Sequence, residues 1–582
     1  MLRLLRTVCH LRPSQLFWRL RYSLERPWSS RLAGRWSWRG SSPPVLREAF
    51  PDLPLPEPPR PRGPAAVEML AERRLELLNE SRPFDADSPD WRLGERTSDR
   101  LWTVTLHYHA WAYALAETAA TTSGETARQA ASLVRRGLAD WIRACAIERP
   151  GTAALAWNSY AVATRIGWWI RAYRLARSEI FAGHAALEGE FLRSLWQQAA
   201  YLNAHLEWDL RANHLIRDLV GLALAGRFFR HPRASTWLRR ASALAVEQAA
   251  EQVLADGGDY ERSPKYHLDV MGDLLQLALL TEDEPTRAVL RRTWTSMAEW
   301  IAWMRHPDGA TAHFNDGAAV PAARIAHQVR SGERLGVGFD LAPRRGGRHL
   351  ASSGFVVWHG DEWSVFLDVG PLGPDEQTGH GHADTLSIEC SLRGRRLVVD
   401  PGTFGYDADE RRRYDRSTRA HNTVCIDGRD SSELWHVFRA GRRARPRDVS
   451  VSFRADGFLA GAFHDGYDHL PGRPRHRRTL RLQDPGIFSI EDEVSGAGSH
   501  ELEGGLLIEP AWEVRTDGAG WIAELDGLRV AIGVAGDDRP ELFAEQRQYH
   551  PDYGSERRAT RIGWRRRGPL PWSLRLILSA VS

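Results

Sequence analysis

The chain has 582 residues and a formal net charge of +4. Its length allows roughly two to four domains with large cores, and the near-neutral charge gives no indication of a nucleic-acid partner. The four cysteines, Cys9, Cys145, Cys390 and Cys425, have neither metal-binding spacing nor the pattern of a disulfide framework.

Residues 1–65 are predicted to be a basic, proline-rich extension. Charged residues interrupt the first twelve positions, so no apolar signal-peptide core is legible. No apolar run anywhere reaches the length of about 18 residues that predicts a transmembrane helix. Residues 14–24 combine Leu16, Phe17 and Leu20 with Arg19 and Arg21, followed by Arg26. Such an amphipathic basic helix either docks at a membrane surface or, more commonly, packs on the body of the protein. The nine prolines of residues 43–64 predict an extended linker or wrap.

Residues 66–340 are predicted to be helical. Apolar residues recur at spacings of three and four, as in Leu101, Val104, Tyr108 and Leu115. No strand-like stretch is expected between 66 and 305. Tryptophan is frequent, with 17 of 24 lying before residue 304; many should be core, but aromatic rings in a groove also stack on sugars. Together these features predict an incomplete α/α toroid around a groove. The helices are expected at about 125–147, 152–178, 185–206, 212–229, 234–255, 265–281 and 286–304.

Residues 345–582 change to short alternating runs separated by Gly, Asp and Pro turns. This spacing predicts an antiparallel β-sandwich, which makes the whole an α+β multidomain chain. A polymer substrate could lie in the cleft between toroid and sandwich. The predicted strands include 354–358, 364–369, 386–392, 396–399, 423–426, 488–491 and 574–578.

Two histidines within residues 378–389, His380 and His382, are flanked by glycines and lead into an apolar strand-like run. Asp400 and His421 follow, each at the edge of another such run. A His/Asp/His set at neighbouring strand ends suits a zinc-like cation. For the two histidines alone, the commoner interpretation is loop histidines without a metal.

Three polar stretches interrupt the helical half. The first is 211–215, in which Asn213 and His214 open a helix. The second is the loop 257–267, in which Pro264 is placed to start a helix and Asp259 or Ser263 to cap it. The third is 313–317, on the connection into the β half.

Taken in order, Asn213-His214, GGDYERSPKYH, GHGHAD, VVDPGTFGYD and RAHNTV resemble the heparinase II/III-like polysaccharide lyases, including alginate lyases of that architecture. The resemblance implies an α/α toroid, a C-terminal antiparallel β-sandwich and cleavage of an anionic, uronate-containing polysaccharide by β-elimination. By motif, Asn213 and His214 would neutralise the uronate carboxylate, Tyr266 would be the catalytic tyrosine and His380 its acid/base partner. His382, Asp400 and His421 would hold one divalent metal, expected to be a structural zinc.

The chemistry explains these residue types. Hydrogen bonds from Asn213 and His214 would stabilise the enolate-like charge that develops when the C5 proton leaves. A tyrosine with a pKa near 10 is a poor base unless cations such as Arg262 or the metal favour its phenolate. If proton and leaving group lie on one face of the sugar, Tyr266 can serve both; otherwise Tyr266 and His380 divide the roles.

Further residues are expected at the same cleft. Tyr414 is a second candidate proton donor, and Arg262, Tyr260 and Asn315 are candidate substrate-binding residues. Tyr266 is preferred over Tyr260 for proton transfer because it follows Pro264, in the first turn of a predicted helix.

Two other functions stay open. A glycoside hydrolase would need two carboxylates across the scissile bond; Asp259, Glu261 and Asp316 are available but lack evident partners. The second alternative is that the chain is a non-catalytic glycan-binding protein of an exopolysaccharide pathway. Members of the resembled family usually carry a secretion signal, so a periplasmic or cell-envelope location is expected from the resemblance and a cytoplasmic one from the missing signal.

Overall fold

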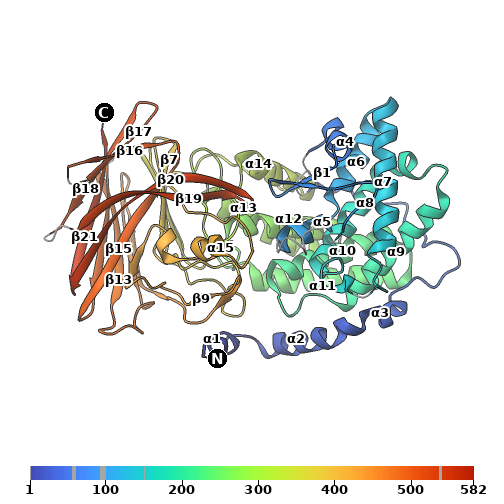
Figure 1. Cartoon of the computed structure of the whole chain (residues 1–582), viewed down its shortest axis with the longest axis horizontal. Coiled ribbons are helices and arrows are strands. Elements are labelled where there is room, and N and C mark those ends of the chain that lie inside the picture. The colour runs from blue at the N-terminus through green and yellow to red at the C-terminus, as the bar shows by residue number, and fades with distance from the viewer. Residues whose placement is uncertain are drawn as a thin grey trace.

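The computed structural model describes residues 2–55, 61–91, 100–149, 151–484, 486–518, 520–536 and 540–581. A helical region forms one half of the molecule and a pair of β-sheets the other (Figure 1). The predicted fold class, a helical toroid followed by an antiparallel β-sandwich, is confirmed. Helices give way to strands between Leu335 and Gly346, whereas the limits assigned to each domain stay predictions.

The helical region packs as antiparallel pairs, with α10 against α8, α11 and α12. Its predicted helices are confirmed to within a few residues, except that the second begins at Ser159. The tryptophans are core residues: Trp102, Trp141, Trp169 and Trp237 are almost completely buried. The helices are α4 (Pro64–Ala71), α5 (Arg100–Leu106), α6 (Ala110–Thr121), α7 (Gly124–Ala144), α8 (Ser159–Phe181), α9 (Ala185–Ala204), α10 (Ala212–Phe228), α11 (Pro232–Gln252), α12 (Pro264–Leu280), α13 (Glu284–Trp303) and α14 (Ala322–Ser331).

A hairpin of β1 (Arg74–Leu77) and β2 (Glu80–Pro83) lies inside this region. The expectation that no strand occurs there was wrong. Each strand has only four residues, too few for a visible alternation. The turn residues Leu78 and Asn79 both have positive φ, 54° and 60°, as the common two-residue hairpin turn requires.

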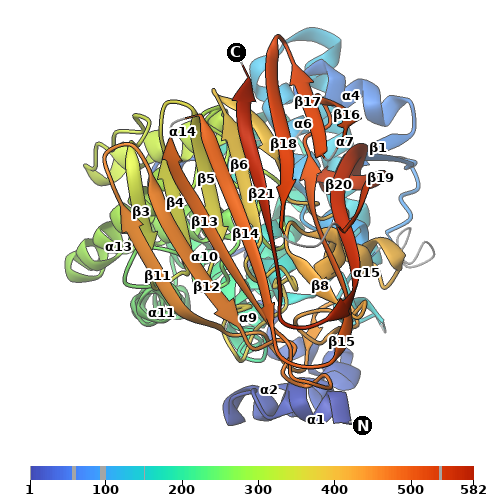
Figure 2. The ribbon, with the colours of Figure 1, turned by 90° about the vertical axis from the view of Figure 1, so that its left-hand side faces the viewer.

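Two antiparallel sheets pack face to face in the β half (Figure 2). One has the order β11-β12-β13-β14-β21-β18-β17-β16, and the other β19-β20-β15-β7-β6-β5-β4-β3, with β8 paired to β15. Apolar side chains of both sheets, such as Val365, Leu480 and Trp564, form one core. The strands are β3 (Gly346–Leu350), β4 (Phe355–His359), β5 (Trp363–Asp368), β6 (Ile388–Leu392), β7 (Arg395–Val398), β8 (Val424–Ile426), β9 (Leu434–Trp435), β10 (Arg439–Ala440), β11 (Pro446–Phe453), β12 (Phe458–His464), β13 (Arg475–Asp484), β14 (Ile487–Ser495), β15 (Ser499–Ile508), β16 (Glu513–Asp517), β17 (Gly520–Leu525), β18 (Leu528–Ala535), β19 (Glu541–Asp552), β20 (Ser555–Pro569) and β21 (Trp572–Val581).

The N-terminal segment runs along the outside of both halves as α1 (Leu2–Val8), α2 (Pro13–Glu25) and α3 (Ser29–Leu32) (Figure 1). The helix predicted at 14–24 is therefore confirmed by α2. Of the proline-rich stretch, residues 56–60 lie outside the described part of the chain. The residues before position 56 lie along the helical region, and Leu46 forms an isolated antiparallel β-bridge with Phe229 of that region. A search of the described helices finds none that is long and apolar enough to cross a bilayer.

Candidate active site

Residues from three distant segments meet where the helical and β halves adjoin. Asn213 stands in the first turn of α10, Tyr266 in the first turn of α12, and His380 in the loop before β6. The rings of Tyr266 and His380 are stacked, with centroids 3.8 Å apart and planes at 23°. Nδ2 of Asn213 lies 3.4 Å from Nε2 of His380. The structure therefore brings these three candidate residues together, while their catalytic roles stay predictions.

Local backbone signals explain how these side chains are held. Ser263 caps α12, because its hydroxyl accepts a hydrogen bond from the Tyr266 amide at 3.3 Å and Pro264 follows it. His267 is buried and hydrogen-bonded to the Met297 carbonyl at 3.0 Å. Leu386 was predicted to belong to a strand, but it adopts a φ of 65°. The strand β6 begins only at Ile388, so both histidines of the GHGHAD motif lie in a loop.

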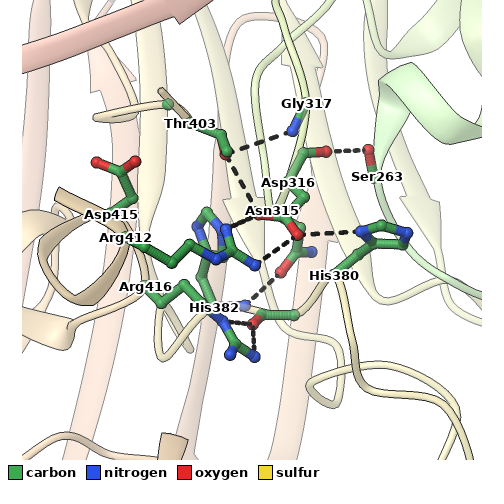
Figure 3. A network of polar contacts seen from close by, with 12 residues as sticks. Ser263, Asn315, Asp316, Gly317, His380, His382, Thr403, Arg412, Asp415 and Arg416 are labelled. Carbon is green, nitrogen blue, oxygen red and sulfur yellow. Dashed lines mark hydrogen bonds and ion pairs between the residues drawn. The ribbon is translucent and has the colours of Figure 1, made fainter. Parts of the chain in front are cut away.

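The carboxylate of Asp316 joins the two loop histidines (Figure 3). It lies 3.0 Å from Nδ1 of His380 and 2.9 Å from Nε2 of His382, and Arg412 pairs with both of its oxygens. Burial would raise the pKa of Asp316, but Arg412 and the hydrogen bonds from the two histidines hold it well below its usual value. Asp316 was predicted only as a candidate hydrolase carboxylate, so its contacts with both histidines and with Arg412 were not predicted.

These contacts decide the tautomers. An ionised carboxylate only accepts hydrogen bonds, so Nδ1 of His380 and Nε2 of His382 carry the protons. Nε2 of His380 is then left with a lone pair, beside Asn213 and 3.7 Å from Oε1 of Glu261. Nδ1 of His382 is buried and has no hydrogen-bond partner among the described residues.

The hydroxyl of Tyr266 belongs to a cluster of three phenols. It lies 2.6 Å from the hydroxyl of Tyr406 and 3.3 Å from that of Tyr553, and these two are 2.8 Å apart. Tyr406 and Tyr553 also line a cavity of about 240 Å³. Neither residue was predicted, although Tyr406 is the next-to-last residue of the VVDPGTFGYD motif and could have been noticed there.

The electrostatics of Tyr266 differ from expectation. Burial, followed by the neighbouring phenols and Asp316, raises the pKa of Tyr266 well above its usual value. The ammonium of Lys265 lies 4.4 Å from the ring centroid, but it is paired with Asp269 at 2.6 Å. Burial and the neighbouring phenols thus outweigh any cation among the described residues and favour the neutral phenol of Tyr266, whereas the effect of the metal on Tyr266 stays a prediction.

His214 follows Asn213 but points to a separate carboxylate. Its Nδ1 lies 3.0 Å from Oε2 of Glu207. Burial lowers the pKa of His214, but the charge and hydrogen bond of Glu207 outweigh burial and the net shift is upward. About 31% of its side chain is exposed, so His214 is the most accessible of the predicted catalytic residues described so far.

Two predicted substrate-binding residues have other partners. The guanidinium of Arg262 donates to the carbonyls of Ser353 (2.9 Å), Tyr260 (3.0 Å) and Ser352 (3.4 Å). The amide of Asn315 donates to the Arg262 carbonyl at 3.0 Å and accepts from the His382 amide at 2.9 Å. Their polar atoms are engaged in holding the α12 loop against the β half, and their contact with substrate stays a prediction.

The remaining two tyrosines lie apart from the phenol cluster. The hydroxyl of Tyr260 is buried and has no hydrogen-bond partner in the described chain, so it keeps its candidacy. Tyr414 was expected to face the same cleft, but it lies in α15 (Glu410–Asp415) beside Gln546, Arg547 and Glu556. The opposite side of that helix carries Arg412 toward Asp316, so Tyr414 points away from Tyr266.

The predicted metal ligands converge. One ligand atom from each of His382, Asp400 and His421 lies within 4.8 Å of the others, and all three residues are buried. Nδ1 of His421 is 2.8 Å from Oδ2 of Asp400, and its Nε2 is 3.0 Å from the Asp415 carbonyl. The unpartnered Nδ1 of His382 and an unpartnered oxygen of Asp384 nearby fit a cation. The group could therefore hold a metal ion.

Comparison with known proteins gives two family matches. The model "Heparinase II/III N-terminus" matches residues 74–335, and "Heparinase II/III-like, C-terminal" matches residues 342–579. FtsZ-localized protein C of Caulobacter vibrioides is 24% identical over 490 residues, which cover 79% of this chain and 76% of that protein.

A heparin-sulfate lyase of Pedobacter heparinus is 25% identical over 272 residues, or 41% of this chain, and this match spans only 40% of that enzyme. A crystal structure of heparinase III superposes with a TM-score of 0.73 at 17% identity, covering 98% of this chain and 92% of the other. At such identity the superposition shows a shared fold.

Proposed function

Because the chain belongs to the heparinase II/III family, we propose that it is a polysaccharide lyase that cleaves a uronate-containing glycan by β-elimination. The observation that carries this proposal is the stack of Tyr266 on His380, with the side-chain amide of Asn213 3.4 Å from Nε2 of His380. The relatives named heparin-sulfate lyase support an anionic glycosaminoglycan as the substrate class.

The first step is neutralisation of the uronate carboxylate. Asn213 and His214 emerge together from the first turn of α10, and the raised pKa of His214 favours its cationic form. A cation and an amide donor on the carboxylate would stabilise the charge that develops on it when C5 loses its proton.

Proton transfer then uses both stacked rings. We assign removal of the C5 proton to Nε2 of His380, which keeps a lone pair because the proton of Nδ1 is hydrogen-bonded to Asp316. The C5 electron pair forms the C4–C5 double bond, the C4–O4 bond breaks, and the neutral phenol of Tyr266 gives its proton to O4. We divide the two roles although the stacked rings reach the sugar from one side, because burial disfavours the phenolate that Tyr266 would need to act as the base.

We further propose that His382, Asp400 and His421 hold one divalent cation, zinc by their donor types. When bound, it would supply a fixed positive charge that holds the loop before β6. The Nε2–H of His382 bonds to Asp316 and orients the opposite nitrogen toward the ion, as outer partners of metal ligands do.

The glycoside hydrolase alternative is not favoured. Both oxygens of Asp316 are occupied by Arg412 and the two histidines, and one oxygen of Glu261 accepts a hydrogen bond from the backbone N–H of Asn213 at 3.2 Å. Neither carboxylate is free to flank a glycosidic bond as the partner of the other.

The chemical nature of the product tests the proposed lyase activity. The purified full-length chain is incubated with heparan sulfate, hyaluronan and alginate, and the ultraviolet absorbance of an unsaturated uronate end is followed. We expect product from at least one polymer. A folded protein that yields only saturated ends would be a hydrolase, and one that yields no new ends with any polymer would be a non-catalytic family member.

A further inference from the structure

We propose that the N-terminal strap, defined as residues 2–39 with α1, α2 and α3, docks this protein peripherally on an anionic lipid bilayer. This inference does not depend on the proposed catalytic activity. It rests on where exposed apolar side chains gather, how α2 is oriented, and how charge is distributed along the chain.

Exposed apolar side chains are concentrated in the strap. Of the fourteen large hydrophobic residues that are exposed in the described chain, eight lie between residues 2 and 28. Phe17, Leu20 and Leu24 expose 59%, 63% and 63% of their surface. Isolated exposed leucines are ordinary, but a contiguous group marks an interaction surface. The group consists of Leu2, Leu4, Leu5, Leu16, Phe17, Leu20, Leu24 and Trp28.

The orientation of α2 explains the exposure. Gln15 and Tyr22 face the body and are buried, and the Tyr22 hydroxyl donates to the Leu206 carbonyl at 2.5 Å. At about 100° per residue, Leu20 and Leu24 stand roughly opposite these two residues. The polar contacts of α2 thus turn its apolar stripe outward, the reverse of an ordinary surface helix.

Arginines surround this stripe. Residues 1–39 contain nine arginines and one glutamate, a net charge of +8, whereas the whole chain carries +4. The rest of the chain is therefore net acidic, at −4. Arg26, Arg31, Arg35 and Arg39 have no ion-pair partner within the described ranges, and Arg31 lies over the ring of Trp28 at 4.5 Å. An apolar stripe bordered by arginine and aromatic residues is the pattern of helices that lie in a membrane interface.

The strap is fixed to both halves of the protein. In α1, Arg6 pairs with Glu433 at 3.0 Å and the Thr7 hydroxyl donates to the Ala440 carbonyl at 2.8 Å. Between α1 and α2, Arg12 pairs with Glu251 of the helical region and with Glu376 of the β half. Figures 1 and 2 both place α1 and α2 at one outer edge of the molecule. The docking face is therefore formed before it meets a bilayer.

Charge decides between a bilayer and a second copy of this chain. Two straps packed face to face would bring together the arginines that have no ion-pair partner, which repel, whereas anionic headgroups attract each arginine near the surface. The leucines and Phe17 would enter the boundary between headgroups and acyl chains, while the buried face of α2 stays on the protein.

The experiment is co-sedimentation of the full-length chain with vesicles of phosphatidylcholine alone or with about one-third phosphatidylglycerol. We expect binding to the anionic vesicles that weakens as salt is raised. The double variant Leu20→Glu/Leu24→Glu should bind at least about tenfold more weakly. Leu175→Glu/Leu459→Glu, at exposed positions outside the strap, is the matched control and should bind as the parent does.

Three results would overturn the proposal. The intact chain could fail to bind anionic vesicles, or the strap variant could bind as tightly as the control. Alternatively, the parent could be a dimer at micromolar concentration that the strap variant converts to a monomer, without vesicle binding; the face would then join two copies. Every substituted side chain is exposed, so we expect equal thermal unfolding midpoints for the parent and the variants. Equal midpoints show that a difference in vesicle binding does not come from unfolding.

Discussion

Oδ2 of Asp316 lies 3.0 Å from Nδ1 of His380, and this contact determines which nitrogen of the imidazole faces Asn213. Because the carboxylate accepts a hydrogen bond from Nδ1–H, Nε2 keeps the lone pair that a base requires. The same carboxylate fixes His382 for the metal-binding group. Asp316 therefore connects the proposed chemistry to the proposed metal site.

Replacing Asp316 with Asn should reduce kcat by about 10²–10⁴. The amide can donate where the carboxylate only accepted, so His380 is no longer held in one tautomer. KM should change little, because Asp316 does not face the sugar. Steady-state kinetics on the preferred polymer give both constants.

Loss of Asp316 also leaves Arg412 buried without its partner, which can cost about 3–5 kcal/mol of stability. Thr403→Val is the control, since it leaves the carboxylate in place and removes the 3.3 Å contact of the Thr403 hydroxyl with Asp316 and the 3.4 Å hydrogen bond that this hydroxyl accepts from the Gly317 amide. A folded Asp316→Asn enzyme with parental kcat would contradict the positioning role.

Removing the proposed metal should lower the thermal unfolding midpoint. An ion at about 1,000 times its Kd stabilises the folded state by about 4 kcal/mol, and a chelator withdraws that contribution. Elemental analysis should find one divalent ion per chain. His421→Ala should unfold earlier than the parent and show no further decrease with chelator; equal chelator sensitivity of the two proteins would rule out this site.

The sequence predicts the elements better than the connections between them. The helix limits were visible because caps such as Ser263-Pro264 are local signals. Asn213, Tyr266 and His380 were predicted as a group only through the family motifs. The contacts of Asp316 could not be found in this way, since its partners His380 and Arg412 are 64 and 96 residues away in the sequence.

Burial was the other unpredictable quantity. The sequence shows that Arg262 carries a positive charge that could bind substrate. It does not show the three backbone carbonyls that accept hydrogen bonds from the guanidinium. The phenols of Tyr406 and Tyr553 raise the pKa of Tyr266 only because the fold brings them next to it. A tertiary contact of this kind leaves no periodic trace in the chain.

The acid stability of the β half should depend on Glu503. Burial opposes its ionisation, but hydrogen bonds from Arg419 and Arg565, with the charge of Arg561, lower the pKa of Glu503 to about 2. The stabilisation by Glu503 is therefore complete above its unfolded-state value near 4.5 and is lost as the pH falls from there toward 2.

Thermal unfolding midpoints measured between about pH 2 and pH 7 test this. Glu503→Gln should be less stable than the parent at neutral pH and should show a shallower loss on acidification. Glu491→Gln, which removes a single pair with Arg575 at 2.9 Å, is the control. Parallel curves for the parent and Glu503→Gln would refute the assignment.

Tyr266→Phe should abolish most of the turnover while the protein stays folded. The substitution keeps the ring that stacks on His380 and deletes only the hydroxyl that we assign to protonation of O4. The loss should appear in kcat, by about 10²–10⁴, with little change in KM, because the proton moves in the transition state. Tyr414→Phe is the matched control, since its hydroxyl has no partner among the described residues and points away from this site. The kcat of Tyr406→Phe should fall between those of Tyr266→Phe and Tyr414→Phe, because this substitution removes one hydrogen bond from the Tyr266 hydroxyl but leaves the proton of that hydroxyl in place. If Tyr266→Phe and Tyr414→Phe turn over equally fast, Tyr266 is not the proton donor.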